Sequence, residues 1–294
     1  MIAFAANSII GRAALRSQNE VDLIDPASYT AIRIAAGAIV LLLIQWFRFG
    51  SNLFGVSNSK NANASGFARF LLSPLMLVIY AAGFSFAYIG LDTASGTLIL
   101  FAFVQITMLS IGLLAKEIPR PVEIAGLTIA SGGLVYLVLP NLQTPLLKES
   151  ILMAVAGVAW GSYSVLGKKS LDPISSTATN FAIGTLMVFC LPFFFRDQIS
   201  LSGYGVFLAV MSGGIASGLG YVLWYLVLPL LRSAQAAAVQ LSVPIFAALG
   251  GVLLVGDELN TRIVVAGALI LFGIGLTVKW KKPVTSESQI KTDS

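Results

Sequence analysis

Long apolar runs alternate with short charged or turn-rich segments along the whole chain, and a polar break recurs about every 20 to 30 residues. Nine of the runs have the roughly 17 to 25 residues that a helix needs to cross a bilayer, and the first run is shorter by about one turn. The pattern predicts an all-α integral membrane protein with ten transmembrane helices. The predicted spans are Ile2–Leu15, Pro26–Phe47, Leu71–Ile89, Thr93–Ala115, Pro121–Leu139, Ser150–Leu166, Ile174–Phe195, Tyr204–Leu228, Ala234–Val255 and Ile263–Val278.

The short first run allows more than one interpretation. As a transmembrane segment it must tilt, thin the bilayer, or belong to a sequence whose start lies upstream. A cleaved signal peptide is the alternative, but the segment has no basic n-region. Its polar residues Asn7, Ser8 and Arg12 also interrupt any h-region, so the transmembrane interpretation is favoured.

Composition excludes several classes of protein. The mean hydropathy is +0.88 and only 11% of residues are charged, too few to cover a soluble globule of 294 residues. The lipid bilayer is therefore an expected partner. The chain has no His and only Cys190, so we expect no disulfide, no metal site, no cofactor and no Cys-His or Ser-His nucleophile.

The positive charge indicates membrane orientation. The net charge of +5 comes from basic residues at the ends of apolar runs, which argues against a nucleic-acid partner. If both termini are cytoplasmic, twelve of the 18 Lys and Arg residues lie in inner segments and five in outer ones, with Arg33 inside a span. This bias predicts a multi-pass protein of the inner (cytoplasmic) membrane with both termini in the cytoplasm.

Two segments of the chain repeat an earlier pattern. Residues 25–31 (Asp-Pro-Ala-Ser-Tyr-Thr-Ala) precede residues 172–178 (Asp-Pro-Ile-Ser-Ser-Thr-Ala) by 147 positions. At an offset of 141, Tyr80 matches Tyr221 and Glu117 matches Glu258. The match predicts two five-helix repeats, at residues 1–145 and 146–282, followed by a cytoplasmic tail at 283–294. Because five is odd, the repeats have opposite orientations, an arrangement that favours alternating access.

The order of these motifs resembles the EamA-type branch of the drug/metabolite transporter superfamily. The resemblance rests on residues 256–260 (Gly-Asp-Glu-Leu-Asn) with Gly267 and Gly273, on Pro244 in the ninth span, and on Arg33 after an Asp-Pro start. The chain departs from the pattern at Phe103, where the repeat partner of Pro244 is expected, and in its short first span. The resemblance implies secondary transport of small metabolites, often amino acids or related compounds, and often export.

Aromatic residues in two spans are candidates for a substrate cavity. Tyr80, Phe84 and Tyr88 fall on one face of the third span. Their counterparts in the eighth span are Tyr221, Trp224 and Tyr225. The two faces could hold a flat or apolar substrate between them. Interfacial anchoring or core packing is the alternative, and it applies most to Tyr88 and Tyr225 near the span ends.

Other polar and aromatic groups inside the spans extend the candidate cavity. Gln105 and Gln240 lie within apolar runs, where an amide must bond a neighbouring helix or the substrate. Trp160 and Tyr163 flank Gly161 in the sixth span, and either lines the cavity or packs against a neighbouring helix. Pro244 removes a helical hydrogen bond and predicts either a hinge or a static kink in the ninth span.

Arg33 is the one charged residue firmly inside a predicted span, about two turns from its start. A charge at this depth is costly unless it finds a partner. Arg33 either anchors a carboxylate or phosphate of the substrate or extends outward to Asp25, Asp22 or loop carbonyls. The structural interpretation is the favoured one.

The acidic residues lie at span ends or in loops, so no proton relay is visible at mid-membrane. Glu117 and Glu258 occupy equivalent span ends and are expected to cap the N-terminus of the next helix. Asp92, Asp257 or Glu258 could still take part in coupling from a vestibule, while facilitated diffusion or exchange fits equally well. The chain has no Gly-rich nucleotide motif.

The favoured function is transport of a small-molecule substrate by a protein that is a monomer or a homodimer and not an enzyme. One alternative is an intramembrane lipid-modifying enzyme, which would need clustered acids, His or metal ligands near one membrane face. The other alternative is a non-transporting membrane scaffold.

Overall fold

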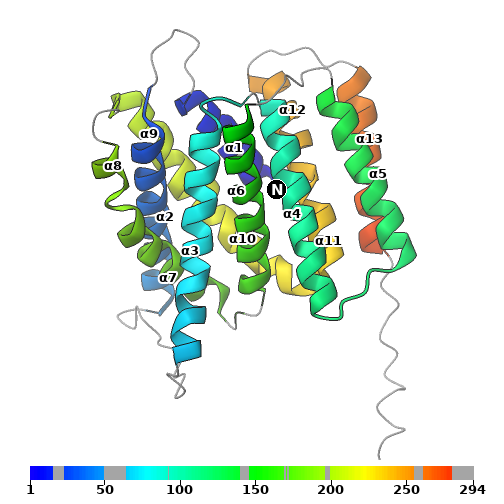
Figure 1. Ribbon diagram of the computed structural model, residues 1–294, viewed down its shortest axis with the longest axis horizontal. Helices are drawn as coiled ribbons and strands as arrows, with labels where there is room; N and C mark the ends of the chain where they lie inside the picture. The colour runs from blue at the N-terminus through cyan, green and yellow to red at the C-terminus, as the bar shows by residue number, and fades with distance from the viewer. Residues whose placement is uncertain are drawn as a thin grey trace, which may run out of the picture.

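The chain forms an all-α bundle, shown by a computed structural model in Figure 1. The structure describes residues 1–15, 23–49, 64–91, 93–139, 146–168, 170, 172–195, 199–254 and 261–279. Nearly all of these residues are helical. The helices are α1 (Ile2–Leu15), α2 (Pro26–Phe49), α3 (Ala64–Ala87), α4 (Thr93–Leu114), α5 (Pro121–Val138), α6 (Leu147–Gly167), α7 (Pro173–Val188), α8 (Leu191–Phe194), α9 (Gly203–Met211), η3 (Ser212–Leu219), α10 (Gly220–Val227), η4 (Leu228–Leu230), α11 (Ser233–Gln240), α12 (Ser242–Leu254) and α13 (Thr261–Lys279).

The predicted spans agree with these helices. Within the described residues, nine helical stretches are long and apolar enough to cross a membrane, and α1 is a shorter apolar helix. Several predicted spans are built from more than one element: α9, η3, α10 and η4 together make the eighth, and α11 with α12 makes the ninth. The prediction of an all-α membrane protein is confirmed.

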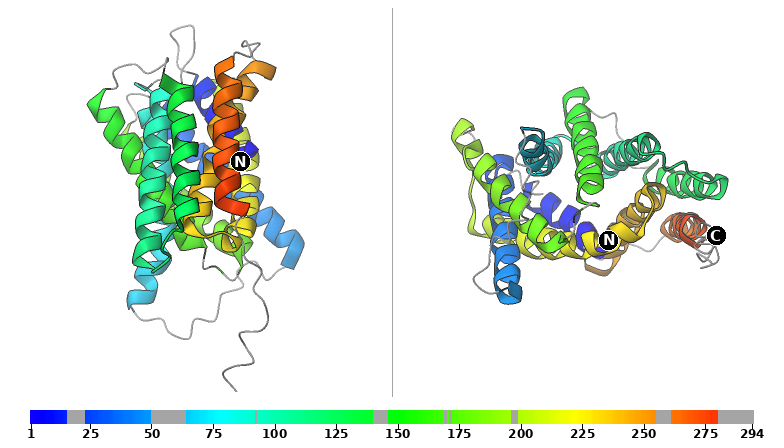
Figure 2. Two further views of the ribbon diagram at one scale, coloured as in Figure 1. Left: turned by 90° about the vertical axis from the view of Figure 1, so that its right-hand side faces the viewer. Right: turned by 90° about the horizontal axis from the view of Figure 1, so that it is seen from below.

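The helices run roughly side by side, and α5 and α13 stand together at one edge of the bundle (Figures 1 and 2). The central part joins elements from both halves of the chain, since α6 packs on α3 and α4 while η3 packs on α2. We call the bottom of Figure 1, where α2, α4 and α6 end, the lower end. The N-terminus lies at mid-height, so α1 occupies the upper half of the bundle.

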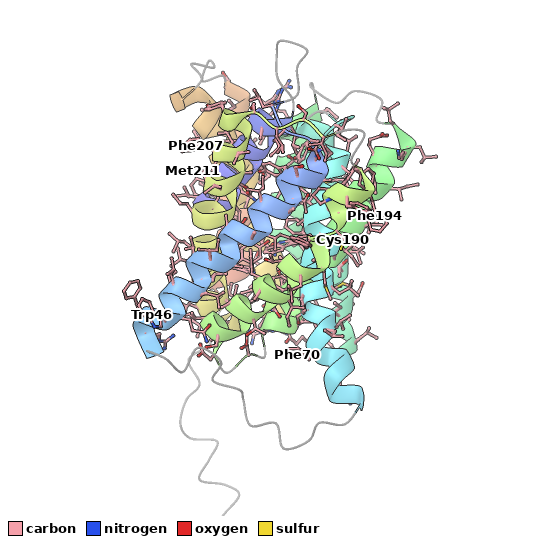
Figure 3. The ribbon with its side chains drawn as sticks, turned by 90° about the vertical axis from the view of Figure 1, so that its left-hand side faces the viewer. Trp46, Phe70, Cys190, Phe194, Phe207 and Met211 are labelled. Atoms are coloured by element: carbon pink, nitrogen blue, oxygen red, sulfur yellow. The ribbon has the colours of Figure 1, made fainter. Side chains whose placement is uncertain are left out.

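The outer surface of the bundle is apolar. Trp46 of α2, Phe194 of α8 and Phe207 of α9 point away from the helices that carry them (Figure 3). Their exposed fractions are 49%, 77% and 54%. Large apolar side chains with this exposure are stable in hydrocarbon and costly in water, so this surface suits contact with lipid tails.

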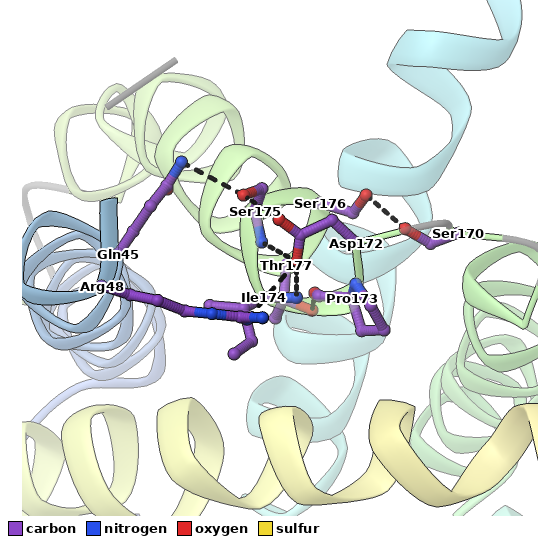
Figure 4. A network of polar contacts seen from close by, with 9 residues as sticks. All are labelled: Gln45, Arg48, Ser170, Asp172, Pro173, Ile174, Ser175, Ser176 and Thr177. Carbon is purple, nitrogen blue, oxygen red and sulfur yellow. Dashed lines mark hydrogen bonds and ion pairs between the residues drawn. The ribbon is translucent and has the colours of Figure 1, made fainter. Parts of the chain in front are cut away.

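The two Asp-Pro motifs build the same local structure. Asp172 begins α7 by accepting hydrogen bonds on Oδ1 from the backbone N–H groups of Ile174 (3.2 Å) and Ser175 (3.4 Å), while Oδ2 accepts from the Ser175 hydroxyl (2.7 Å; Figure 4). Gln45 and Arg48 of α2 reach this corner. Asp25 likewise caps α2, accepting on Oδ1 from the backbone N–H of Ser28 at 2.8 Å. Both aspartates are therefore helix caps.

The eighth and ninth spans are irregular where they meet the centre of the bundle. The eighth contains the π-helix η3, a geometry that is rare and concentrated at functional sites. The ninth is interrupted at Leu241, between α11 and α12. Pro244 lies three residues later and lacks the N–H that would bond the Gln240 carbonyl, so the predicted bend coincides with a break. Its role as a hinge stays a prediction.

Close helix packing depends on glycine in the α5–α13 pair. A Cβ added at Gly126 would lie 2.5 Å from the Gly273 carbonyl oxygen, and one added at Gly273 would lie 2.4 Å from the Gly126 carbonyl oxygen. Gly126 and Ala130 form a small-residue pattern that serves packing, because both lie against Gly273.

We expect Gly126→Ala to lower the stability of the protein by about 1–3 kcal/mol, because the added methyl group must push two backbones apart. The measurement is the midpoint of thermal unfolding in detergent. Gly132→Ala in the same helix is the matched control, since a Cβ there meets nothing within 4 Å. Equal midpoints for the two variants would contradict the packing argument.

Candidate functional site

The centre of the bundle holds a cluster of aromatic rings from four helices. Trp160 of α6 lies between Tyr80 of α3 and Tyr221 of α10, with ring centroids 5.0 Å away in both cases. Phe4 of α1 packs edge-on against Trp160 at 5.3 Å and against Tyr221 at 5.6 Å. Trp160 thus contacts one tyrosine from each predicted aromatic face, and the side chains of Tyr80 and Tyr221 also contact each other.

A hydrogen bond fixes the position of the Trp160 ring. Its Nε1 donates to Oε1 of Gln240 at 2.5 Å, and Nε2 of Gln240 donates to the Met108 sulfur at 3.0 Å. Gln240 is nearly fully buried, so these contacts satisfy an amide that would otherwise be costly in an apolar core. Gln240 joins α6, α4 and α11 at the depth of the aromatic cluster.

A small cavity lies beside this cluster. It has a volume of about 20 Å³, room for about one water molecule. A substrate would therefore need the helices or the rings to move. The lining residues are Phe4, Ser8, Tyr80, Phe84, Leu100, Phe101, Trp160, Gln240 and Val243.

A second hollow of about 210 Å³ lies between α3, α4 and α6. Its lining is almost wholly apolar, as in Leu72, Met76 and Ile111, and it opens at the bundle surface. The hydrogen-bonding groups that would orient a polar substrate are missing from this lining apart from Ser162. The smaller cavity is therefore the better candidate site.

Tyr163, Trp224 and Tyr225 lie behind the cavity rather than along it. The Tyr225 hydroxyl donates to the Tyr163 carbonyl at 2.9 Å, and Trp224 Nε1 donates to the Ser164 hydroxyl at 3.4 Å. Asn180 donates to the Tyr163 hydroxyl at 3.4 Å. Along α6, Tyr163 lies one turn closer to the lower end than Trp160. These residues close the bundle below the cavity.

Arg33 is buried, with an exposed fraction of 2%. Its Nε donates to the Ser217 hydroxyl of η3 at 3.2 Å, and its guanidinium carbon lies 5.6 Å from the ring centroids of both Tyr80 and Phe84. The guanidinium therefore turns inward, toward the rings that line the cavity.

The favoured interpretation of Arg33 was an outward reach to Asp25, Asp22 or loop carbonyls, and for Asp25 it is wrong. Asp25 uses one oxygen to cap α2 and the other to accept from the Ser200 backbone at 3.2 Å. An inward direction is possible because η3 supplies Ser217 and α3 supplies the two ring faces. Asp22, the other expected partner, lies outside the described residues.

A chain of hydroxyl groups runs next to Arg33. Tyr29 of α2 donates to the Ser212 hydroxyl at 2.8 Å, and Ser212 in turn donates to the side-chain oxygen of Asn7 on α1. The chain ties α1 and α2 to η3. The irregular helix thus supplies both serines that position the polar groups of α1 and α2.

Two of the remaining candidates lie away from the cavity. Gln105 does not line it: its Oε1 accepts from the Ser131 hydroxyl of α5 at 3.1 Å. Gln105 lies one turn beyond the lining residue Phe101 and about 100° around α4 from the buried Val104, on the side that meets α5. Tyr88 packs edge-on against Phe84 at 4.6 Å, beyond the lining residues.

Several lining residues are not among the predicted candidates. Phe4, Leu100, Phe101 and Val243 are apolar, and nothing in their local sequence separates them from lipid-facing residues. Ser8 follows Asn7, and a polar pair inside the short first apolar run could have indicated that this segment lines the cavity. The short α1 contributes directly to the site.

The lower end of the bundle carries a cluster of ion pairs, which we call the lower-end clamp: Glu117, Glu123, Lys168, Arg232 and Ser233. Glu117 accepts from Lys168 Nζ at 3.0 Å and from the Ser233 backbone N–H at 2.9 Å. Arg232 donates to Glu123 at 2.7 Å. Glu117 does cap a helix N-terminus, but the helix is α11 and not the next helix, α5, whose N-terminus is capped by Glu123 accepting from the Arg120 backbone N–H at 2.8 Å. Glu258, Asp92 and Asp257 lie outside the described residues.

Hydrogen bonds to the Glu117 carboxylate determine the direction in which its pKa shifts. Desolvation by itself would raise its pKa. The bonds from the Ser233 backbone and from Lys168 outweigh that effect and lower the pKa of Glu117 from 4.5 to about 2. Glu117 is therefore ionised at every physiological pH, and the clamp is a fixed contact rather than a proton-responsive one.

Comparison with known proteins shows which family the chain resembles. The sequence profile of the EamA-like transporter family matches residues 147–279. An uncharacterized protein of Pseudomonas aeruginosa is 40% identical over 276 residues, covering 94% of this chain and 91% of that protein. The chain belongs to the EamA-like transporter family.

Other relatives of this EamA-like transporter are also described as transporters. An uncharacterized transporter of Archaeoglobus fulgidus is 28% identical, covering 80% of this chain and 82% of that protein. The uncharacterized transporter YoaV of Bacillus subtilis is 22% identical, covering 85% and 86%. A crystal structure superposes with a TM-score of 0.74 at 18% identity, covering 96% of this chain and 98% of that one, which shows the fold. The chain is thus a multi-pass membrane protein of a transporter family.

Proposed function

We propose that this EamA-like transporter is a secondary carrier that moves a small metabolite across the cytoplasmic membrane by alternating access. The observation that carries the proposal is the aromatic cavity at the seam of the two halves of the chain. Phe4, Tyr80 and Phe84 come from the first half, while Trp160 and Gln240 come from the second. A site shared by two halves can open to either side when one half moves against the other.

The domain organisation and sidedness are part of the proposal. Two inverted five-helix repeats, at residues 1–145 and 146–282, are supported by the matching Asp25 and Asp172 caps and by the family profile, which falls within the second. Both termini are cytoplasmic, as the distribution of basic residues favours. The lower end then faces the cytoplasm.

Substrates are small metabolites, with amino acids and related compounds the first class to test and export the expected direction. The test is counterflow in proteoliposomes against a labelled panel of these compounds, with and without a pH gradient. Flux that responds to the gradient supports a proton-coupled carrier, and gradient-independent counterflow supports an exchanger or uniporter. A substrate recovered in covalently altered form, or no flux across the panel, would contradict the proposal.

Tyr80→Ala is expected to reduce flux about tenfold while folded yield stays near wild type, because it removes a ring that lines the cavity and contacts Trp160. Tyr221→Ala should have a similar effect through the opposite face of Trp160. Initial rates per folded protein are the measurement. Tyr204→Ala is the control, since Tyr204 stacks on Phe207 at the exposed surface. Parallel loss of flux and folded protein would make Tyr80 and Tyr221 packing residues.

A further inference from the structure

Arg33 carries an unsatisfied donor in the core of the bundle. Its Nη1 is buried and has no hydrogen-bond partner among the residues that the structure describes. Arg33 follows the first residue of α2 by seven positions, which places its backbone about 10 Å along the helix. A buried cation with an unpaired donor is costly, and side chains of this kind inside membranes mark substrate pathways.

The surroundings of Arg33 fix its geometry. The Ser217 hydroxyl accepts from Nε, the Tyr80 side chain is a second hydrogen-bond partner of the guanidinium, and the rings of Tyr80 and Phe84 lie beside it. The same two rings line the cavity. A ligand in the cavity is therefore separated from Nη1 by one layer of aromatic side chains, and rotation of either ring would bring the two together.

The charges near the site indicate what kind of ligand this is. Asp25, the acidic residue at the start of the same helix, does not neutralise Arg33, because one of its oxygens caps α2 and the other accepts from the Ser200 backbone. One guanidinium with one free Nη1 matches a group that carries one negative charge, because a second charge would stay buried and unpaired. The lining beyond the rings is mostly apolar.

We propose that Arg33 is the anion-binding residue of the cavity and that it selects a ligand with a single carboxylate on a flat, apolar body. The carboxylate accepts a hydrogen bond from Nη1 after Tyr80 or Phe84 rotates, and the body of the ligand lies against Phe4 and Trp160. This inference rests on the proposed function only in using the same cavity.

The test is a binding titration on the purified full chain in detergent, followed by tryptophan fluorescence. The probes are 3-phenylpropionate and 3-phenylpropionamide, which share one body and differ in charge. We expect the carboxylate to bind about tenfold more tightly than the amide. Equal affinities, or no binding of the carboxylate, would overturn the proposal.

Three variants assign the preference to Arg33. Arg33→Gln should reduce the ratio of the two affinities to about one, and Arg33→Lys should reduce it partly because the planar fork is lost. Arg262→Gln is the matched control, since Arg262 also lies over a ring, 5.5 Å from Tyr136, but at the edge of the bundle. If Arg33→Gln does not fold, an unchanged ratio in Arg33→Lys overturns the proposal.

A third probe separates a carboxylate from a phosphate. 2-Phenylethylphosphonate carries more than one negative charge at neutral pH and should bind more weakly than the carboxylate. Tighter binding would overturn the single-charge assignment. Because binding is measured without a membrane, carboxylate preference without flux would contradict the proposed function alone, and flux without this preference would contradict the inference alone.

Discussion

A Gly213→Ala variant is expected to lose most of its folded yield. A Cβ added at Gly213 would lie 2.0 Å from the Arg33 carbonyl oxygen and 2.8 Å from its carbonyl carbon. Both atoms are backbone, so neither can turn aside, and α2 and η3 must separate. Separation would also loosen the bonds from Tyr29 to Ser212 and from Arg33 to Ser217. Together these losses should cost about 3 kcal/mol or more.

The matched control for Gly213→Ala is Gly218→Ala in the same π-helix. A Cβ at Gly218 would meet its nearest atom, the Gly213 carbonyl oxygen, at an ordinary 3.4 Å. Folded yield by size-exclusion chromatography and the midpoint of thermal unfolding are the measurements. If Gly213→Ala is as stable as Gly218→Ala, the close approach of α2 and η3 is not what positions Arg33.

The positions of the spans could be predicted because lipid imposes a length and an apolar composition on each crossing. The Asp-Pro motifs at residues 25 and 172 were also visible in the sequence, at the start of the two matching segments. That both aspartates cap a helix is a finding of the structure.

The site was harder to predict because its membership depends on helix rotation. Gln105 and Gln240 look alike in sequence, yet one bonds Ser131 between two helices and the other holds Trp160 beside the cavity. In an apolar transmembrane helix the face toward lipid and the face toward the bundle have similar compositions, so the local sequence does not show which face turns inward. Four of the predicted residues do line the cavity, namely Tyr80, Phe84, Trp160 and Gln240, and the first three are large aromatics.

The direction of Arg33 depended on the irregular η3. A regular helix over residues 212–219 would present different side chains to α2, because a π-helix has more residues per turn. Within η3 the close approach to α2 is at Gly213, whereas a Cβ at Gly218 would make only an ordinary contact at 3.4 Å. The sequence did not predict the wider turn that brings Ser212 and Ser217 to Tyr29 and Arg33.

The charges of the lower-end clamp are not repeated in the sequence. At offsets of 141 and 147, Arg232 corresponds to Leu91, Glu123 to Val264 and Lys168 to Val21. Glu117 alone among these four has an acidic counterpart, Glu258. Under the proposed alternating access, the contacts of the clamp would favour the state in which the lower end is closed.

Glu117→Gln is therefore expected to open the lower end. The variant loses the negative charge that pairs with Lys168 and that strengthens the hydrogen bond from the Ser233 backbone N–H, which together should shift the equilibrium by about 2 kcal/mol, or roughly thirtyfold, after allowance for partial solvent exposure. The readout is maleimide labelling of Ser164→Cys, a fully buried position one turn before Lys168, in a Cys190→Ser background. Labelling from the lower end should accelerate accordingly.

The pH dependence and a matched variant separate the clamp from a general loosening of the bundle. Because folding depresses the pKa of Glu117 to about 2, its stabilisation is complete above about pH 4.5 and is lost as the pH falls toward 2. Labelling of the parent should thus be constant between about pH 5 and 8 apart from the reagent's own chemistry. Arg48→Gln breaks the exposed pair with Asp172, 3.8 Å apart at the same end, and exposed pairs of this kind contribute little. Equal acceleration in Glu117→Gln and Arg48→Gln would mean that the lower end is held by packing around Tyr163 and Tyr225 rather than by the clamp.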